Sequence, residues 1–358
     1  PRATASSAAV SRWTIITKTV PSPINSSRLK SHFSQLPSIV IVHHSQFPVA
    51  VQRQLLVALR LGQVPPKFLY DSDRQTQKWL AVHRAHSPSR TDAGVQSIYD
   101  RAFDESLGQS ADEAVCLVGL GCGGGQKDTR HLAKLKSIHP IVDYVPCDVS
   151  QAMTRVAREA AAAELPLERI HPLVCDLANA PDLGQVLDTI VSPETKRVFT
   201  FFGMIPNLEP DVILPRLAEL LLEGHQLVLS ATLAPRDDYR GGGEVILPQY
   251  DNPETRDWLL SFLVGLGVSA TEGRLRFGIE EIDKLLRIVA DFEFSESLEL
   301  SIGGESFEFA AGRALRLFFS YRHTEQTLAK HLAKHSLTIA ASQFDSSAEE
   351  GVFRVERV

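Results

Sequence analysis

Residues 115–125 read VCLVGLGCGGG, and this stretch decides the fold class. A short apolar run typical of a buried strand ends in a cluster of glycines, and residues 128–135 then continue with a helical pattern. Glycine permits positive φ and lets a ligand approach the backbone closely, while the first turn of a helix offers free N–H groups. The stretch therefore predicts the first strand, loop and helix of a nucleotide-binding α/β domain.

The same rhythm continues beyond this stretch. Segments suited to strands alternate with helical patterns, and the expected strands are residues 115–120, 141–145, 170–174, 197–202 and 227–231. Helices are expected at residues 151–164, 183–191 and 212–222. Such alternation predicts a doubly wound α/β fold, in which a parallel sheet carries helices on both faces. Residues 325–358 predict a helix and two further strands, an ending shared by the sheet of common methyltransferases.

Composition excludes several classes of protein. The chain has 358 residues, of which 44% are hydrophobic and 22% charged, as in globular proteins with about two domains. A net charge of −6 argues against a nucleic-acid partner, because such proteins usually carry a basic face. No apolar run approaches the roughly 18 residues of a membrane helix, so no membrane partner is expected. The sequence shows no coiled-coil pattern that would favour a dimer, so we expect a monomer.

The N-terminal region and the cysteines bear on location. Residues 1–36 are rich in Ser, Pro and Thr and predict a flexible arm. Eight Lys and Arg residues precede Asp71, the first acidic residue, so an organelle transit segment is an alternative. The four cysteines form no CxxC pair, which favours a reducing, cytoplasmic compartment. We expect no metal site, although His331 and His335 have a helical spacing that suits one.

Acidic residues end the second and third expected strands. Asp148 suits the hydroxyls of a ribose, and Asp176-Leu177 suits an adenine. The glycines at positions 119, 121 and 124 also match GxGxxG, so the loop fits an NAD-dependent oxidoreductase, a binder of S-adenosylmethionine (SAM) or a structural turn. The expected C-terminal hairpin favours SAM, since a nicotinamide enzyme has no particular need of it.

The rest of the chain predicts a second, smaller α+β domain. Helices are expected at residues 47–61, 73–82, 253–266 and 279–289, a loop at 236–243, and strands at 292–300 and 306–317. We expect residues 37–92 and 236–319 to form this substrate-binding domain. Residues 93–235 and 320–358 are expected to form the SAM-binding domain.

Six segments extend this interpretation: residues 67–71 (KFLYD), 89–92 (SRTD), 119–129 (GLGCGGGQKDT), 144–150 (YVPCDVS), 201–207 (FFGMIPN) and 249–253 (QYDNP). In this order they resemble the SAM-dependent histidine Nα-methyltransferases of ergothioneine biosynthesis and their relatives, which include fungal N-methyltransferases of tryptophan derivatives. The resemblance covers about Gln54 to the C-terminus. It implies a class I SAM-methyltransferase fold, a role in secondary metabolism, and S-adenosylhomocysteine (SAH) as the product of the cofactor.

The resemblance also implies roles for individual residues. Its SAM-binding positions match Gly119, Gly121, Lys127, Asp148 and Asp176; Leu177 is expected, from its place after Asp176, to cover the adenine. The positions that bind the amino and carboxylate groups of the substrate match Asn207 and Tyr250, and Tyr70 matches the tyrosine at the methyl-transfer pocket. Packing at an interface is the alternative for Tyr70 and Tyr250, and a turn is the alternative for Asn207.

The chain departs from this family at the substrate pocket. Adjacent tyrosines are replaced by His86 and Ser87, and the glutamate that accepts an imidazole N–H is replaced by Phe318, although its serine partner is retained as Ser320. Loss of such a partner costs roughly a few kcal/mol of recognition. The sequence therefore predicts methyl transfer to the amino nitrogen of a small amino-acid-like molecule other than histidine. A non-catalytic SAM-binding regulatory protein is a further alternative.

Overall fold

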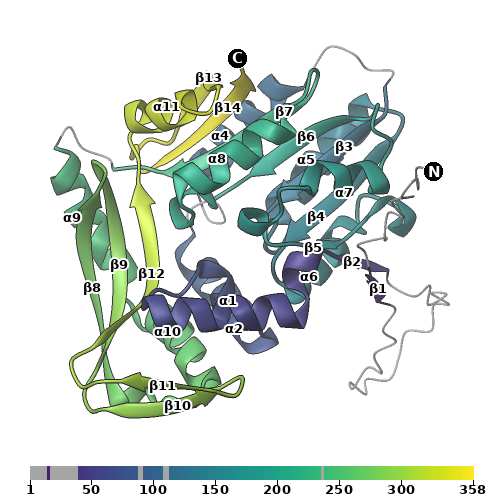
Figure 1. The fold of residues 1–358 in the computed structure, drawn as a ribbon. Coiled ribbons are helices and arrows are strands. Elements are labelled where there is room, and N and C mark those ends of the chain that lie inside the picture. Colours follow the sequence, from purple (N-terminus) through teal and green to yellow (C-terminus); the bar gives the residue numbers. More distant parts are fainter. Residues whose placement is uncertain (1–13, 17–38, 88–91, 108–112, 235–237) are drawn as a thin grey trace, which may run out of the picture.

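The structure, a computed structural model, describes residues 14–16, 39–87, 92–107, 113–234 and 238–358. Figure 1 shows a large sheet with helices on both faces beside a smaller group of antiparallel strands and helices. The expected flexible arm, residues 1–36, lies outside the described residues except for β1 (Thr14–Ile16). Among the described helices, none is long and apolar enough to cross a membrane.

The large sheet has nine strands in the order β1-β2-β5-β4-β3-β6-β7-β14-β13. Six of them run parallel: β2 (Val40–Val42), β3 (Val115–Leu120), β4 (Val142–Asp148), β5 (Leu173–Val174), β6 (Lys196–Phe201) and β7 (Gln226–Thr232). The hairpin of β13 (Leu337–Phe344) and β14 (Glu350–Arg357) is antiparallel and joins the sheet through β7. The predicted doubly wound fold and its C-terminal hairpin are therefore confirmed.

Two hydrophobic cores lie on the two faces of this sheet, because successive strand residues point to opposite sides. Cys116, Val118 and Leu120 of β3 belong to the core formed with α7 (Leu183–Ile190), α8 (Pro210–Leu220) and α11 (Glu325–Ala333). Val115 and Leu117 belong to the core formed with α4 (Ala93–Ser106), α5 (Gln126–Ile138) and α6 (Gln151–Ala161). Burial on both faces explains why the strand sequences are almost uniformly apolar.

The smaller part contains a three-stranded antiparallel sheet of β8 (Gly273–Ile282), β9 (Leu285–Phe294) and β12 (Ala314–Arg322), with β9 in the centre. A separate hairpin comprises β10 (Leu298–Ile302) and β11 (Glu305–Phe309). The helices are α1 (Pro48–Leu61), α2 (Asp73–His86), α9 (Tyr239–Tyr250) and α10 (Pro253–Gly265). Their apolar side chains share one core with the strands, centred on Trp258, Phe292 and Leu317.

Several predicted elements of this part differ from the structure. The expected strands at residues 292–300 and 306–317 each span a turn that joins two strands, β9 to β10 and β11 to β12. Residues 279–289, expected as a helix, form the end of β8, a turn and the start of β9, and Asp283 and Lys284 have φ of 49° and 67° in that turn. Pairing of β9 with strands on both of its edges overrides the local helical pattern. Residues 236–243 were expected as a loop, but α9 already begins at Tyr239; residues 235–237 lie outside the described residues.

Two strands connect the parts. In Figure 1, β12 runs from the smaller sheet toward α11 on the large one, and His323 just beyond it pairs with Leu233 at the end of β7. Residues 40–42, expected in the smaller domain, form β2 and pair with β5 in the large sheet. The two parts are therefore joined by backbone pairing as well as by side chains.

Candidate active site

The glycine-rich loop lies at the carboxyl end of β3, where the strand order reverses, and ligands of doubly wound sheets bind at this edge. The N–H groups of Gly121 and Cys122 donate to the carbonyl of Cys147 at 2.8 and 3.0 Å, which fixes the loop against β4. Gly121 has φ of 71°, which glycine adopts without strain. A Cβ at this position would lie 2.5 Å from the side chain of Met204, so only glycine fits there.

A buried carboxylate supports this loop. Asp128, in the first turn of α5, accepts hydrogen bonds from the hydroxyls of Tyr144 and Thr200 at 2.7 and 2.8 Å. Burial raises the pKa of Asp128 to about 6, although the two hydroxyls partly offset this. Gly119 is required because a Cβ there would lie 2.1 Å from the carboxylate. Sequence reasoning gave Asp128 no role, and the signal for it was an acidic residue in the first helical turn after the loop.

Asp148 ends β4 beside the loop. Its carboxylate accepts hydrogen bonds from the N–H groups of Gly123 and Ser150 at 3.0 and 2.9 Å. Burial raises the pKa of Asp148 to about 6, and the N–H groups of Ser150 and Gly123 partly counter this. The structure thus brings Asp148 together with the glycine loop.

Asp176 follows β5 and is held by several donors. It accepts from the N–H of Ala178 at 3.2 Å and from the side-chain amide of Asn179 at 2.9 Å. Its carboxylate also lies 3.1 Å from Nζ of Lys67, and both side chains are less than a tenth exposed. Leu177 packs into the core of the large sheet. The contact with Lys67, which the sequence did not predict, fastens the segment before Tyr70 to the edge of the large sheet.

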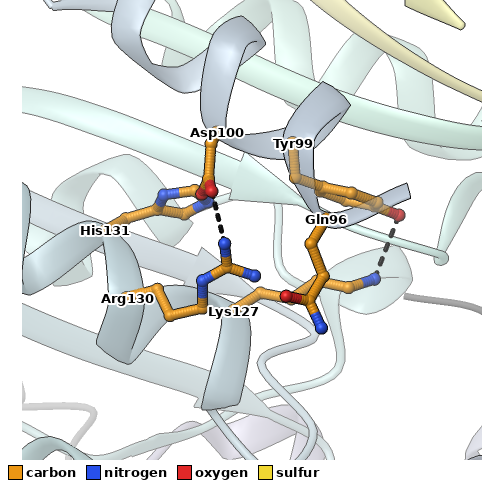
Figure 2. Close-up of a pocket in the computed structure, with 6 residues that line it drawn as sticks. All are labelled: Gln96, Tyr99, Asp100, Lys127, Arg130 and His131. Carbon is orange, nitrogen blue, oxygen red and sulfur yellow. Dashed lines mark hydrogen bonds and ion pairs between the residues drawn. The ribbon is translucent and has the colours of Figure 1, made fainter. Parts of the chain in front are cut away.

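Lys127 lies in a partly buried polar cluster between α4 and the sheet (Figure 2). Its Nζ is 3.0 Å from the hydroxyl of Tyr99 and 4.1 Å from the centre of that ring. The Tyr99 hydroxyl also lies 2.8 Å from the hydroxyl of Ser230 and is hydrogen-bonded to the carboxyl of Glu350. Burial raises the pKa of Glu350, and the charge of Lys127 opposes this. The hollow that Figure 2 shows has a volume of about 10 Å³, enough for about one water molecule.

Tyr70 stands between the cofactor edge and the smaller part. Its ring lies 5.8 Å from Trp79 and 5.5 Å from Trp258, measured between ring centres. Burial raises the pKa of the Tyr70 phenol, and the neighbouring Asp148 and Tyr250 raise it further. The phenol is therefore neutral at physiological pH. Tyr70 is linked to Tyr250 through the neighbouring rings of Trp258 and Phe318. The hydroxyl of Thr76 donates to the Tyr70 carbonyl and lies 3.1 Å from the hydroxyl of Ser150, two residues beyond Asp148.

Asn207 and Tyr250 both reach β12. Asn207 ends the short helix η5 (Ile205–Asn207) after β6, and its side-chain amide donates to the carbonyl of Phe319 at 2.7 Å. The Tyr250 hydroxyl lies 3.3 Å from the hydroxyl of Ser320. Two residues assigned to binding of the acceptor therefore contact the strand that carries Ser320.

Phe318 lies on the same face of β12 as Ser320. Its ring is 5.8 Å from that of Tyr250 and 6.0 Å from that of Trp258, so an aromatic cluster occupies the position expected of a glutamate. His86 lies at the exposed end of α2, with Nε2 3.4 Å from Glu254. Among the described contacts, the hydrogen bond of His86 therefore goes to α10 and not to the β12 face that carries Phe318 and Ser320.

Ser87, the neighbour of His86, closes α2 by donating its N–H to the carbonyl of His83 at 3.1 Å. Ser89, Arg90 and Thr91 of the SRTD segment lie outside the described residues. The last residue of that segment, Asp92, begins α4 by accepting hydrogen bonds from the N–H groups of Gly94 and Val95.

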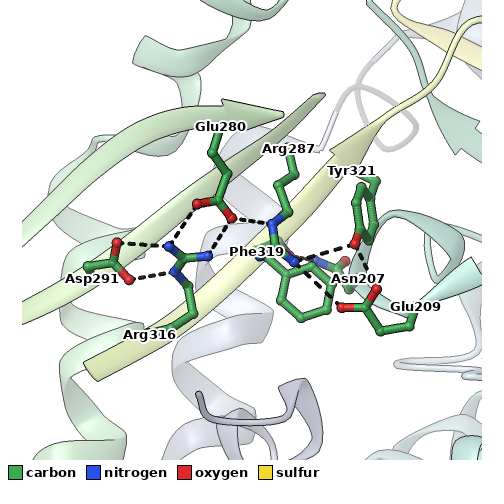
Figure 3. Close-up of polar contacts among 8 residues, drawn as sticks. All are labelled: Asn207, Glu209, Glu280, Arg287, Asp291, Arg316, Phe319 and Tyr321. Atoms are coloured by element: carbon green, nitrogen blue, oxygen red, sulfur yellow. Dashed lines mark hydrogen bonds and ion pairs between the residues drawn. The ribbon is translucent and has the colours of Figure 1, made fainter. Parts of the chain in front are cut away.

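A chain of ion pairs covers the opposite face of β12 (Figure 3). Arg316 pairs with Glu280 and Asp291, and Arg287 pairs with Glu280 and, at 3.5 Å, with Glu209. The Tyr321 hydroxyl donates to Glu209 at 2.7 Å. Because Glu209 is two residues beyond Asn207, this chain and the Asn207–Phe319 hydrogen bond hold the loop after β6 against β12.

Sequence reasoning gave Arg322 no role. The side chain is fully buried and donates to the hydroxyls of Ser320, at 2.7 Å, and Tyr250. The signal for it was its spacing, because residues two apart on a strand share a face. Lys67, Tyr99 and Glu350 were missed because their partners come from distant segments of the chain.

One group of side chains has the spacing of metal ligands. The ligand atoms of His43, His44 and Asp182 all lie within 4.8 Å of one another. Hydrogen bonds account for this closeness, because His43 contacts Ser45 at 2.7 Å and Asp182 at 3.0 Å through its two ring nitrogens. Burial lowers the pKa of His43, but the hydrogen bonds to Cys175 and Asp182 outweigh this and the net shift is upward. A metal at this position would displace a hydrogen bond of His43.

Known proteins point to one class of enzyme. The family of histidine-specific, SAM-dependent methyltransferases matches residues 51–251. The chain also resembles the CcbJ methyltransferase from Streptomyces caelestis, at 16% identity over 74% of this chain and 95% of that one, with a TM-score of 0.37. No curated protein sequence matches the chain.

Two further solved structures are similar. The magnesium protoporphyrin IX methyltransferase ChlM from Synechocystis PCC 6803, with bound SAH, is 13% identical over 80% of this chain and 95% of that one, with a TM-score of 0.41. The glycopeptide N-methyltransferase MtfA, complexed with SAM, is 11% identical over 72% and 92%, with a TM-score of 0.36. These scores are too low to carry an argument about this chain's acceptor.

The doubly wound sheet, the glycine loop and the family match together define a SAM-dependent methyltransferase with a class I fold. The loop suits this cofactor, since Gly119 and Gly121 leave no room for a Cβ and Asp148 lies beside them. The chain belongs to the family of histidine-specific, SAM-dependent methyltransferases. This assignment decides between the two ligands that the glycine loop allowed, in favour of SAM over NAD.

Proposed function

We propose that this enzyme transfers the methyl group of SAM to the amino nitrogen of a small amino-acid-like acceptor other than histidine. The observation that carries the proposal is the position of Tyr70, which is linked to Tyr250 through the rings of Trp258 and Phe318 and, through Thr76 and Ser150, to the segment that holds Asp148. Asp148 is the residue suited to the ribose of SAM, and Tyr250 matches a position that binds the amino acid. The acceptor and the cofactor would therefore meet at Tyr70.

The exclusion of histidine is based on Phe318. A glutamate at this position would accept a hydrogen bond from an imidazole. Phe318 has no such acceptor; its side chain is buried and packs against Tyr250 and Trp258. Phe318 and Ser320 lie outside residues 51–251, the part of the chain that matches the family. Membership of the family is therefore compatible with a different acceptor.

The reaction mainly requires that the acceptor nitrogen, the methyl carbon and the sulfur of SAM lie in line. SAM supplies a methyl group already activated on a sulfonium, and the nitrogen lone pair displaces SAH in line. Asn207 and Tyr250 would orient the amino acid, and Tyr70 would direct the lone pair of the neutral amine toward the cofactor edge. The aromatic side chains of Trp79, Trp258 and Phe318 would exclude water from the reacting groups. The nitrogen then releases its proton to solvent.

We assign residues 37–92 and 236–319, apart from β2 in the large sheet, mainly to binding of the acceptor, and residues 93–235 and 320–358 mainly to binding of SAM. Asn207, Ser320 and Arg322 belong to the second group by sequence but would contribute to the acceptor site. The direct contacts of Tyr250 and Asn207 with β12 support this division of labour. We further infer a monomer in the cytoplasm, and the four free cysteines fit a reducing compartment.

Label transfer tests the proposal. The enzyme is incubated with methyl-labelled SAM and a panel of amino acids and amino-acid-derived amines, and products are identified by mass. A labelled N-methyl product from an acceptor other than histidine is expected. Histidine as the preferred acceptor would contradict the proposed selectivity, and SAH binding without any methyl transfer across the panel would favour a regulatory protein.

A further inference from the structure

The face of β12 that lies toward Tyr250 ends in a charged residue without an assigned role. Phe318, Ser320 and Arg322 share this face because side chains alternate along a strand. Arg322 has 0% of its surface exposed. Its Nη2 donates to the hydroxyls of Ser320 and Tyr250, and its guanidinium carbon lies 5.0 Å from the centre of the Tyr250 ring.

The charge of Arg322 has no counter-charge among the described residues. None of their carboxylates lies within 4.0 Å of the guanidinium, and its Nε and Nη1 atoms are buried without a hydrogen-bond partner. Arg316, on the same strand, differs because it pairs with Glu280 and Asp291. A buried charge is costly unless it is paired, and buried polar atoms without partners are rare. The isolation of Arg322 therefore calls for a partner that comes from a ligand.

We propose that Arg322 is the counter-ion of a carboxylate on the methyl acceptor, an inference that rests on the proposed function. The free Nε–H and Nη1–H groups are donors suited to carboxylate oxygens. Tyr250, whose hydroxyl Arg322 contacts, matches a family position that binds the amino-acid group. Arg322, Ser320 and Tyr250 thus form the polar end of the acceptor site.

The other end of the same face is apolar. The Phe318 ring lies between those of Tyr250 and Trp258, with centres 5.8 and 6.0 Å away. An acceptor that fits both ends has a free carboxylate at one end and an apolar or aromatic group at the other. Amines that lack the carboxylate leave the guanidinium unpaired and are expected to be rejected.

Three aromatic probes test the inference by calorimetry on the SAH-loaded enzyme. L-phenylalanine has an amine and a carboxylate, 3-phenylpropionate only the carboxylate, and 2-phenylethylamine only the amine. Both carboxylates are expected to bind more tightly than 2-phenylethylamine, by about 30-fold or more, because the charge pair is buried. Arg322→Met is expected to remove this preference while SAH affinity stays unchanged.

A second measurement separates ligand binding from a structural role. Without a carboxylate ligand, Arg322→Met is expected to unfold at the same denaturant concentration as the wild type or a higher one, because an apolar side chain replaces an unpaired charge. Tyr250 and Ser320, 3.3 Å apart, then bond to each other. The matched control Arg316→Met is expected to lower the midpoint, since it leaves Glu280 and Asp291 unpaired.

Three outcomes would overturn the inference. One is a wild type without preference for carboxylates, whether it binds all three probes equally or none of them. Another is an Arg322→Met variant that is destabilised as much as Arg316→Met. The third is efficient methyl transfer to an amine that has no carboxylate, which would leave the proposed function intact and remove only the role of Arg322.

Discussion

Nζ of Lys67 lies 3.1 Å from the carboxylate of Asp176, and the two side chains are only 8% and 7% exposed. This pair joins the segment before Tyr70 to the large sheet just beyond the carboxyl end of β5. Breaking a buried ion pair by removing one partner leaves a buried charge behind. The pair therefore matters for stability as well as for the shape of the site.

Lys67→Met is expected to lower the free energy of unfolding by about 3 kcal/mol, because Asp176 loses its counter-charge. Urea denaturation measures the change. Arg60→Met is the control, since Arg60 and Glu305 are about half exposed and such pairs contribute about 0–1 kcal/mol. Equal effects of the two substitutions would show that the buried Lys67–Asp176 pair contributes no more to stability than the exposed Arg60–Glu305 pair.

Gly119→Ala is expected to abolish binding of SAH, because the added Cβ would lie 2.1 Å from the carboxylate of Asp128 and displace the loop. Calorimetry with SAH measures this. Gly184→Ala is the matched control: its Cβ would meet Leu220 at an ordinary 3.8 Å, and alanine favours the helix α7 by about 0.5–1 kcal/mol. A Gly119→Ala variant with wild-type SAH affinity would exclude the loop from the cofactor site.

The affinity for SAH is expected to fall as the pH drops below about 6. Burial raises the pKa of Asp148 to about 6, and the protonated carboxyl is a poorer acceptor for the ribose hydroxyls. Titration calorimetry from pH 5 to 8 measures this, with Asp148→Asn expected to bind weakly at every pH. Since Asp128 titrates in the same range, Asp128→Asn shows which carboxyl is responsible. A wild-type affinity independent of pH would contradict the prediction.

The raised pKa values of Asp148 and Asp128 also predict how the free energy of unfolding changes with pH. Between pH 4 and 6 the folded chain retains protons on Asp148 and Asp128 that the unfolded chain has already released. The contribution of these groups to the free energy of unfolding therefore decreases as the pH rises through this window, and levels off above it.

Phe318→Glu is expected to raise methyl transfer to histidine, measured as kcat/KM, by roughly tenfold or more, because a carboxylate regains an imidazole N–H as partner. Phe318→Gln is the matched control with nearly the same shape and no charge. If the two variants use histidine equally poorly, another position determines the selectivity. Retained SAH affinity in both would confirm that they are folded.

The sequence predicted the large sheet well because its strands are buried on both faces. Uninterrupted apolar runs such as residues 115–120 then leave little ambiguity. It failed for residues 279–289, where charged and apolar residues alternate in a way that also fits a helix and only pairing with distant strands decides. Helix α4, residues 93–106, was also missed.

For the candidate site, sequence motifs indicated residues at or shortly after the ends of strands, such as Asp148, which ends β4, and Asn207 in the short helix after β6. They could not identify Lys67 or Arg322, because the role of each depends on partners that the fold brings from elsewhere. Asp176 is 109 positions from Lys67, and Tyr250 is 72 positions from Arg322. Long-range polar pairs of this kind leave no periodic pattern in the sequence.

The two faces of β12 are subject to different constraints. One face is tied by ion pairs to β8, β9 and the loop after β6, so its residues Arg316 and Tyr321 cannot change without loosening the sheet. The other face presents Phe318, Ser320 and Arg322, which take no part in the ion-pair chain and which we propose to line the acceptor site. A strand built in this way lets evolution alter the acceptor by substituting every second residue while the scaffold stays intact.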